Sequence, residues 1–182
     1  LCMLDANISF ATSAQRLFAG ANSFSLIAIP FFILAGNIMN KGGIAERIVN
    51  VAKVVAGRMP GALAQSNVVA NMLFGAISGS GAAAAAAMGG TIGPMEKKEG
   101  YDPVYSAGVN IASAPTGMLI PPSNLMIVYS TIAGSVSVAA LFTGGYVPGI
   151  LWGLLVMFLA GVKAKKCGYV AEQYPDCYFA YP

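Results

Sequence analysis

Residues 59–95 form an uncharged stretch whose middle is a cluster of small and hydroxyl residues, Ser78, Gly79, Ser80 and Gly81. As one straight helix the stretch would measure about 55 Å at 1.5 Å per residue, whereas the hydrocarbon core of a bilayer is roughly 30 Å thick. Divided at the cluster, each half has about 15 residues and is too short to cross. We therefore expect a helical hairpin that enters a membrane and returns to the side it left.

The composition supports a membrane location. The chain is 57% hydrophobic and 9% charged, with a mean hydropathy of +0.69, whereas soluble domains are about a quarter charged. The expected class is an all-α integral membrane protein in contact with the lipid bilayer. The net charge of +3 is thinly spread and indicates no nucleic-acid partner. The chain has no histidine, so an enzyme is not expected, and an intramembrane protease would need a histidine from a partner segment.

Two segments precede the hairpin. Residues 1–40 are expected to contain a transmembrane region, because residues 17–40 are uncharged. Residues 41–60 are expected to form an amphipathic helix, which would lie along the membrane surface or pack against a neighbouring subunit. Its expected apolar stripe is Ile44, Ile48, Val51 and Val55.

Three segments follow the hairpin, which we assign to residues 61–95. We expect a broken transmembrane helix at 96–134, a second transmembrane helix at 135–166, and either an interfacial segment or a loop at 167–182. The break is predicted because Pro121 and Pro122 remove two amide donors, and the first of them biases Ile120 away from helical geometry.

The basic residues favour a hairpin over a single crossing. If the chain returns at residue 95, the basic residues of 41–58, the pair at 97–98 and the lysines of 163–166 all fall on the cytoplasmic side. A single crossing would place the lysines of 163–166 on the side of the membrane opposite the cytoplasm. If the protein is a transporter, coupling to H+ would usually need a buried carboxylate or histidine. Every acidic residue lies outside the predicted membrane core, so Na+ is favoured over H+ as the coupling ion.

The two predicted breaks are the candidate sites. Broken membrane helices expose carbonyls, which with hydroxyls coordinate Na+, and amide ends, which accept a carboxylate. The small residues Gly75, Gly79 and Ala83 also match a helix-packing motif, so the tip is either a binding site or a packing joint. A channel, or an assembly subunit without a site, remains an alternative to a transporter.

Several motifs resemble, in the same order, the large permease subunit of tripartite ATP-independent periplasmic (TRAP) transporters. They extend over residues 15–166 and are PFFILAGNIM (30–39), GGIA (42–45), ISGS (77–80), PM (94–95), KEGYDP (98–103), IPPS (120–123) with Tyr129, and VPG (147–149).

The resemblance implies a Na+-driven importer of carboxylates, such as C4-dicarboxylates, sugar acids or sialic acids, in the bacterial inner membrane. The family works with a small membrane subunit and a periplasmic substrate-binding protein. Its large subunit has two inverted repeats and moves a transport domain against a scaffold in an elevator mechanism. This chain would be the first half, with residues 1–40 in the scaffold and with the hairpin and the broken helix in the transport domain.

The resemblance also implies site residues. Those of the Na+ site would be Ser78 and the carbonyls of Gly117, Ile120 and Pro122. Those near the substrate would be Gly79, Ser80, Pro121 and Ser123. Many members carry a polar or acidic residue shortly after the Ser-Gly-Ser motif, where this chain has Gly81 and alanines. A second hairpin and a second broken helix are absent from the sequence, so the chain alone is expected to hold half a site and not to transport.

Overall fold

The computed structural model describes residues 6–22, 24–134 and 136–169, and all regular structure in these residues is helical. The expectation of an all-α protein is confirmed. Residues 170–182 of the predicted tail segment lie outside the described part of the chain. The helices are α1 (Ala6–Ala21), α2 (Phe24–Lys41), α3 (Ile44–Ala56), α4 (Ala62–Ser78), α5 (Gly81–Thr91), α6 (Gly93–Lys98), α7 (Pro103–Ser113), α8 (Thr116–Leu119), α9 (Asn124–Ala133) and α10 (Val138–Cys167).

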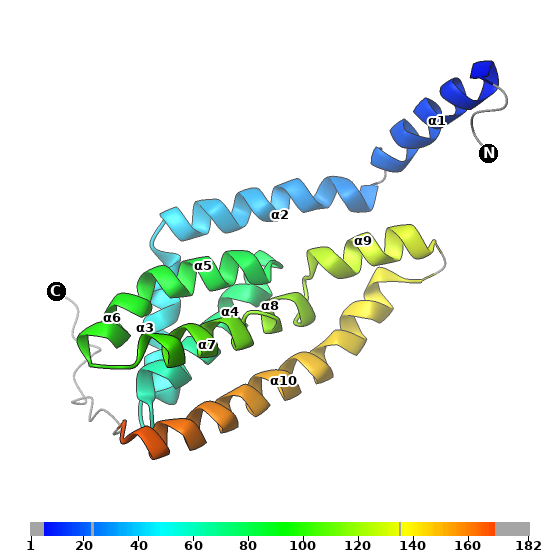
Figure 1. Ribbon diagram of the computed structural model, residues 1–182. Helices are drawn as coiled ribbons and strands as arrows, with labels where there is room; N and C mark the ends of the chain where they lie inside the picture. Colours follow the sequence, from blue (N-terminus) through cyan, green and yellow to red (C-terminus); the bar gives the residue numbers. More distant parts are fainter. Residues whose placement is uncertain (1–5, 23, 135, 170–182) are drawn as a thin grey trace.

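Helix α4 is the centre of the protein (Figure 1). Helices α3, α5, α7, α8 and α10 all contact it, and nearly every residue in its first half is buried. One apolar cluster joins α3, α4 and α5 around Phe74 and Met88, and another joins α4, α7 and α10 around Leu63 and Val68. A helix buried on all sides has to be apolar or neutral on all sides, which explains the absence of charge in α4.

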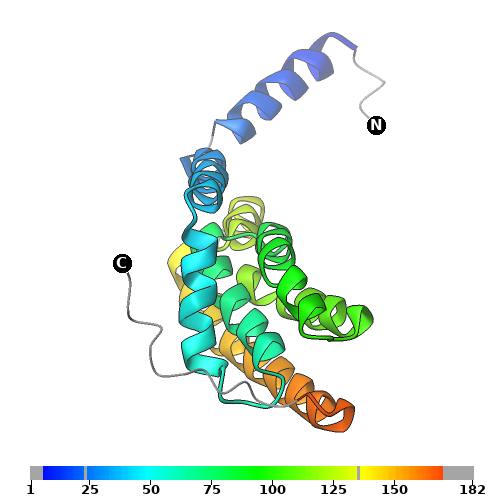
Figure 2. The same ribbon diagram turned by 90° about the vertical axis from the view of Figure 1, so that its left-hand side faces the viewer.

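Helix α3 lies along α4 (Figure 2). The face that packs against the hairpin is formed by Ala45, Val49, Ala52 and Ala56, because alanines permit close approach of two helices. Ile48 of the predicted apolar stripe packs partly against this core, whereas Val51 and Val55 are 54% and 63% exposed. The outward part of the stripe is available to the membrane surface or to a neighbouring subunit, and which of the two it meets stays a prediction.

Helix α10 is long and apolar enough to cross a membrane. Its outward residues are large and apolar, among them Leu151, Leu155, Phe158 and Leu159. The α7–α8 segment, 103–119, and α9 pass the same test together, as two parts of one element bent by 48°. The described residues therefore contain one continuous candidate span and one broken candidate span.

The uncharged stretch 17–40 is divided between two helices. Helix α1 ends at Ala21 and α2 begins at Phe24. Asn22 follows α1, and asparagine competes with the helix for backbone hydrogen bonds. The apolar part Ile29–Met39 of α2 is shorter than a membrane span.

The segment α4–α6 leaves and returns to the same end of α10. Gly61, before α4, lies against Ala164, since a Cβ built on Gly61 would be 2.6 Å from the Cβ of Ala164. After α6, the ring of Tyr101 stacks on Tyr169 with centroids 4.4 Å apart. The turn between α4 and α5 lies at the opposite end of this hairpin.

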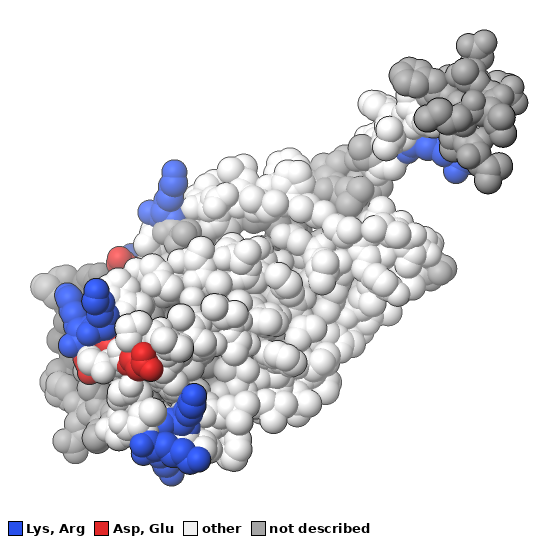
Figure 3. Space-filling model, viewed as in Figure 1, with Lys and Arg blue, Asp and Glu red and all other residues white. Residues whose placement is uncertain are grey.

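Charged side chains gather at the end to which the hairpin returns. On the face shown in Figure 3 they lie over α6, the C-terminal end of α10 and the α2–α3 connection, with a further basic residue on α1. The long middle of this face, over α5, α7, α9 and α10, carries none. Such a division fits a membrane boundary near α6.

Candidate functional site

The hairpin turns at Ser78, Gly79 and Ser80. Gly79 ends α4 in the left-handed conformation (φ 63°), and its amide donates to the carbonyl of Gly75 at 2.8 Å. Ser80 is extended, and its hydroxyl accepts a hydrogen bond from the amide of Ala83 at 3.3 Å, so it caps α5. The hydroxyl of Ser78 lies 3.4 Å from both the amide nitrogen and the carbonyl oxygen of Ser80. The sequence therefore forms a capped helix break at the predicted position.

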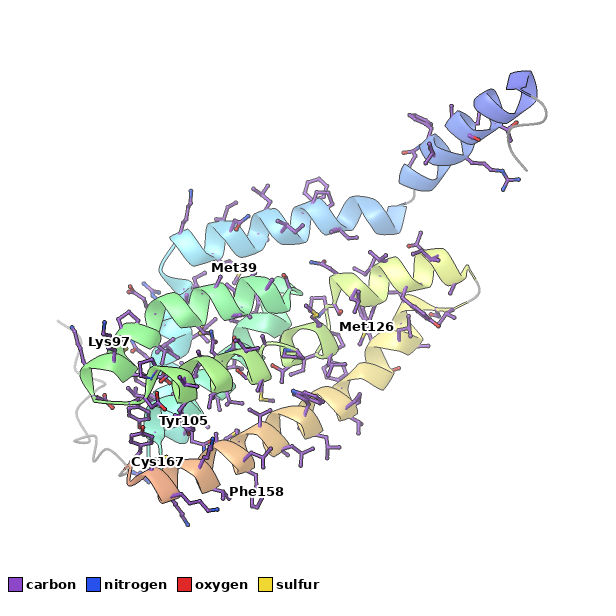
Figure 4. The ribbon with its side chains drawn as sticks, in the orientation of Figure 1. Met39, Lys97, Tyr105, Met126, Phe158 and Cys167 are labelled. Atoms are coloured by element: carbon purple, nitrogen blue, oxygen red, sulfur yellow. The ribbon has the colours of Figure 1, made fainter. Side chains whose placement is uncertain are left out.

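The second break follows α8. Ile120 is extended (φ −80°, ψ 123°), and the peptide bond between Pro121 and Pro122 is cis. Ser123 then caps α9, because its hydroxyl accepts from the amide of Met126 at 3.4 Å. In Figure 4 Met126 lies beside this break, at the base of α9.

The two breaks touch each other through their backbones. The amide of Asn124 donates to the carbonyl of Gly79 at 3.3 Å. A Cβ on Gly79 would lie 2.7 Å from the carbonyl oxygen of Pro122, and a Cβ on Gly81 would lie 2.6 Å from that of Ala114. Only glycine permits this approach. The breaks are therefore one structural unit, formed by segments about 40 residues apart in the chain.

Two carbonyls of this unit lose their usual helical donor. In a continuous helix each carbonyl accepts from the amide four residues later. Pro121 has no amide hydrogen, so the carbonyl of Gly117 has no such donor. The amide of Asn124, which would serve Ile120, bonds to Gly79 instead.

A third carbonyl, that of Pro122, is released by a cap. Its helical donor would be the amide of Met126, and this amide bonds to the hydroxyl of Ser123. The carbonyls of Gly117, Ile120 and Pro122 are the three that the family resemblance implies for a Na+ site. Each keeps an oxygen lone pair that the helix does not use, which is the chemistry a hard cation needs.

The predicted site residues differ in burial. Those that are buried are Ser78 (2% exposed), Ser123 (0%), Ile120 (8%), Gly79, Gly117 and Pro121. Ser80 and Pro122 are half-buried and are the members nearest the surface. Ser78 is covered by α2, where a Cβ on Gly36 would lie 3.3 Å from the Cβ of Ser78. Ser78, Ser80 and Gly79 are thus assembled with Pro122 and Ser123.

Two features of the site were not anticipated from the sequence. Asn124 joins the breaks, and a polar cluster ties α4 to α7 behind them. The side-chain nitrogen of Asn71 lies within 2.8–2.9 Å of side-chain oxygens on Asn67, Asn110 and Ser113. The available signal was the i, i+4 spacing of two asparagines in an uncharged helix, since polar side chains in such helices bond across to a neighbour.

Two interrupted helices that meet backbone to backbone, in an all-helical and largely uncharged protein, define a membrane protein of the discontinuous-helix kind. Comparison with known sequences narrows the class. The chain belongs to the family of the tripartite ATP-independent periplasmic transporter, DctM component, whose model matches residues 1–175. The resemblance seen in the motifs is confirmed.

Similar proteins come from several bacteria. The chain is 53% identical over 174 residues to the uncharacterized protein YgiK of Salmonella typhimurium, covering 95% of this chain and 40% of that protein. It is 44% identical over 158 residues to the C4-dicarboxylate TRAP transporter large permease protein DctM of Vibrio cholerae, covering 86% and 35%. It is 41% identical over 159 residues to the isethionate TRAP transporter permease protein DctMQ of Oleidesulfovibrio alaskensis, covering 87% and 25%.

The chain therefore spans two fifths or less of the length of these relatives. The relatives above whose names state a function are transporter permeases and not enzymes, as the sequence analysis expected.

Proposed function

We propose that this chain is the first half of the large permease of a Na+-coupled TRAP transporter that imports small carboxylates across the bacterial inner membrane. The observation that carries the proposal is that the two helix breaks meet at the Ser78–Ser80 turn and that three carbonyls of the second break have no helical donor. Family membership supports it. In this proposal α4–α5 is a re-entrant hairpin, and with α7–α9 it belongs to a transport domain that moves against a scaffold containing residues 1–40.

The cation side of the site consists of two helix C-termini. Helices α4 and α8 both end at the tip, where their last carbonyls and the negative ends of their dipoles meet. Na+ would be coordinated by the Ser78 hydroxyl and the carbonyls of Gly117, Ile120 and Pro122. All four are neutral oxygens, which suit a monovalent ion better than a divalent one.

The anion side consists of two helix N-termini. Helices α5 and α9 both begin at the tip, with Ser80 and Ser123 as their caps. Their unpaired amides and positive dipole ends would face a substrate carboxylate. Ser80 and Gly79 on one side, and Pro121 and Ser123 on the other, would border the substrate. The rest of the site would come from the second half of the permease.

The partners follow from the same proposal. A small membrane subunit would complete the membrane part, and a periplasmic binding protein would deliver substrate. The small subunit would be either separate or fused to the large one. One relative is named DctMQ, and the match with this chain covers 25% of that protein but 35% of the DctM protein, so the DctMQ protein is the longer of the two.

A cysteine at Ala82 tests the Na+ site. Ala82 is exposed and lies directly after the tip. In the complete permease, with Cys2, Cys167 and Cys177 replaced, we expect the labelling rate of Ala82→Cys by a membrane-impermeant thiol reagent to differ between Na+ and K+ of equal ionic strength. The control is Ala86→Cys, exposed one helical turn further from the tip, whose rate should be equal in both salts. Equal rates at Ala82 in the two salts would remove the support for a Na+ site at Ser78.

Uptake into proteoliposomes tests the substrate and the coupling. With both partners present, a Na+ gradient should drive accumulation of a labelled C4-dicarboxylate above its outside concentration. Dissipating the gradient should abolish accumulation. Equilibration without accumulation would indicate a channel, and accumulation of isethionate but no carboxylate would replace the substrate class with a sulfonate.

A further inference from the structure

A second polar site lies at the opposite end of the hairpin from the tip. A cavity of about 280 Å³ lies between α4, α5, α6 and α7, and its polar lining is Asn67, Glu96, Lys97, Tyr101, Ser106 and Asn110. In Figure 4 Lys97 and Tyr105 lie at this end of the molecule, the end at which α10 finishes with Cys167. The cavity belongs to the hairpin and α7, but none of the residues assigned to the tip lines it.

Glu96 is the residue that makes this cavity unusual. Its side chain is 1% exposed, although α6 lies at the charged end of the protein. The hydroxyl of Ser106 and the side chain of Asn67 lie beside the carboxyl, yet neither Oε1 of Glu96 nor Oγ of Ser106 makes a hydrogen bond of normal geometry to any described group. A buried carboxylate without a full set of partners is costly, so such groups are kept where they bind something.

Most polar groups that line the cavity beside Glu96 are oxygen ligands, and the cations nearby lie at its edge. Helices α4 and α5 contribute no titratable side chain to this region. The charged neighbours on its own segment are Lys97 and Lys98, both exposed, and Glu99, whose negative charge opposes ionisation. From α3, Nζ of Lys53 lies 3.5 Å from Sδ of the adjacent Met95. From the α7 side come the phenols of Tyr101 and Tyr105. The amide oxygens of Asn67 and Asn110 are within the same polar cluster, linked through Asn71.

We propose that Glu96, Ser106 and Asn67 form a binding site for a monovalent cation, with Na+ as the ion to test. Carboxylate, hydroxyl and amide oxygens are the ligands a hard cation prefers. The single carboxylate supplies one negative charge, and the adjacent Lys97 disfavours a second positive charge, so a divalent ion is not matched. The site goes beyond the proposed transport function, because it lies on the far side of the hairpin from Ser78 and does not depend on substrate.

Infrared difference spectroscopy on the complete permease in detergent tests this site. Spectra in NaCl are compared with spectra in choline chloride of equal ionic strength, in mildly acidic buffer. We expect Na+ to shift the infrared bands of one carboxyl group, because the ion ligates a carboxyl oxygen. The variant Glu96→Gln should lack this difference, and the control Glu46→Gln, which changes an exposed carboxyl on α3, should retain it.

The outcomes separate this site from the tip. Ser78→Ala should leave the carboxyl signal intact even if it abolishes Na+-coupled uptake. A wild-type protein without any Na+-dependent carboxyl band would overturn the proposal, and this result needs no variant to fold. A band that persists in Glu96→Gln would also overturn it, because it would place the responding carboxyl elsewhere.

Discussion

Gly75 on α4 and Gly117 on α8 face each other with no side chain between them. A Cβ built on Gly117 would lie 2.7 Å from the Cα of Gly75, and a Cβ on Gly75 would meet the backbone of Gly117 even more closely. The contact lies one turn before the hairpin tip and one turn before the proline break. This glycine pair therefore sets the two breaks at the same level.

Replacing Gly75 by alanine should separate the two breaks. The new methyl group collides with backbone, which cannot rotate away as a side chain could, and overpacking of this kind costs about 1–3 kcal/mol. We expect a lower thermal midpoint of the purified permease and strongly reduced Na+-driven uptake. The matched control is Gly90→Ala on α5, where a Cβ meets nothing within 4 Å. That variant should be unchanged or slightly stabilised, because alanine is the better helix former. Equal behaviour of the two variants would contradict the role of the glycine pair.

The hydroxyl of Ser78 should determine the affinity for Na+. Its removal takes away one proposed ligand while the buried methylene remains, so we expect the Na+ concentration for half-maximal uptake to rise about tenfold, equivalent to roughly 1.4 kcal/mol. The control is Ser66→Ala on the same helix, whose hydroxyl bonds only to the carbonyl of Ala62. Measuring uptake as a function of Na+ concentration, at a fixed substrate concentration, distinguishes Ser78→Ala from Ser66→Ala. An unchanged Na+ dependence in Ser78→Ala would exclude this hydroxyl as a ligand.

The Asn71 side chain should contribute substantially to the attachment of α7 to α4. Alanine at this position leaves the side-chain oxygens of Asn67, Asn110 and Ser113 without a shared donor in a buried region. Buried polar groups left unpaired cost about 1–3 kcal/mol each, so we expect a loss of at least ~2 kcal/mol. Asn50→Ala on the exposed side of α3 serves as the control and should shift stability by no more than about 0.5 kcal/mol. Denaturation of the purified protein measures both.

The positions of both helix breaks could be predicted from the sequence, for local reasons. Two prolines remove amide donors whatever surrounds them, and a Ser-Gly-Ser turn within an uncharged stretch too long for one span favours a break at the glycine. The pairing of the breaks could not be predicted in this way. It depends on the contact of Gly79 with Pro122 and on the bond from Asn124, which join segments distant in the chain.

The sequence was less informative about which faces are buried. Helical periodicity identified the apolar stripe of α3 that contains Val51 and Val55, but not the alanines of α3 that pack against the hairpin. In a membrane protein large apolar side chains are stable facing lipid, so size no longer indicates the core. Glu96 is buried although the charged residues that follow it, at 97–99, are exposed. Its burial depends on the fold of α6 over α4 and α7.

The pH dependence of stability should identify Glu96 as the buried acid. Its pKa is raised from 4.5 in the folded protein, chiefly by burial. Below pH 4.5 both states hold the proton and the folded protein has its full stability. As pH rises, the unfolded chain releases the proton first, so stability falls until pH has passed the raised pKa. In Na+-free choline buffer the stability of Glu96→Gln should not fall in this way, so it should rise relative to that of the wild type as pH increases above 4.5. The stability of Glu46→Gln should follow that of the wild type. Thermal midpoints recorded across this pH range measure the difference, and parallel profiles for wild type and Glu96→Gln would contradict a raised pKa at Glu96.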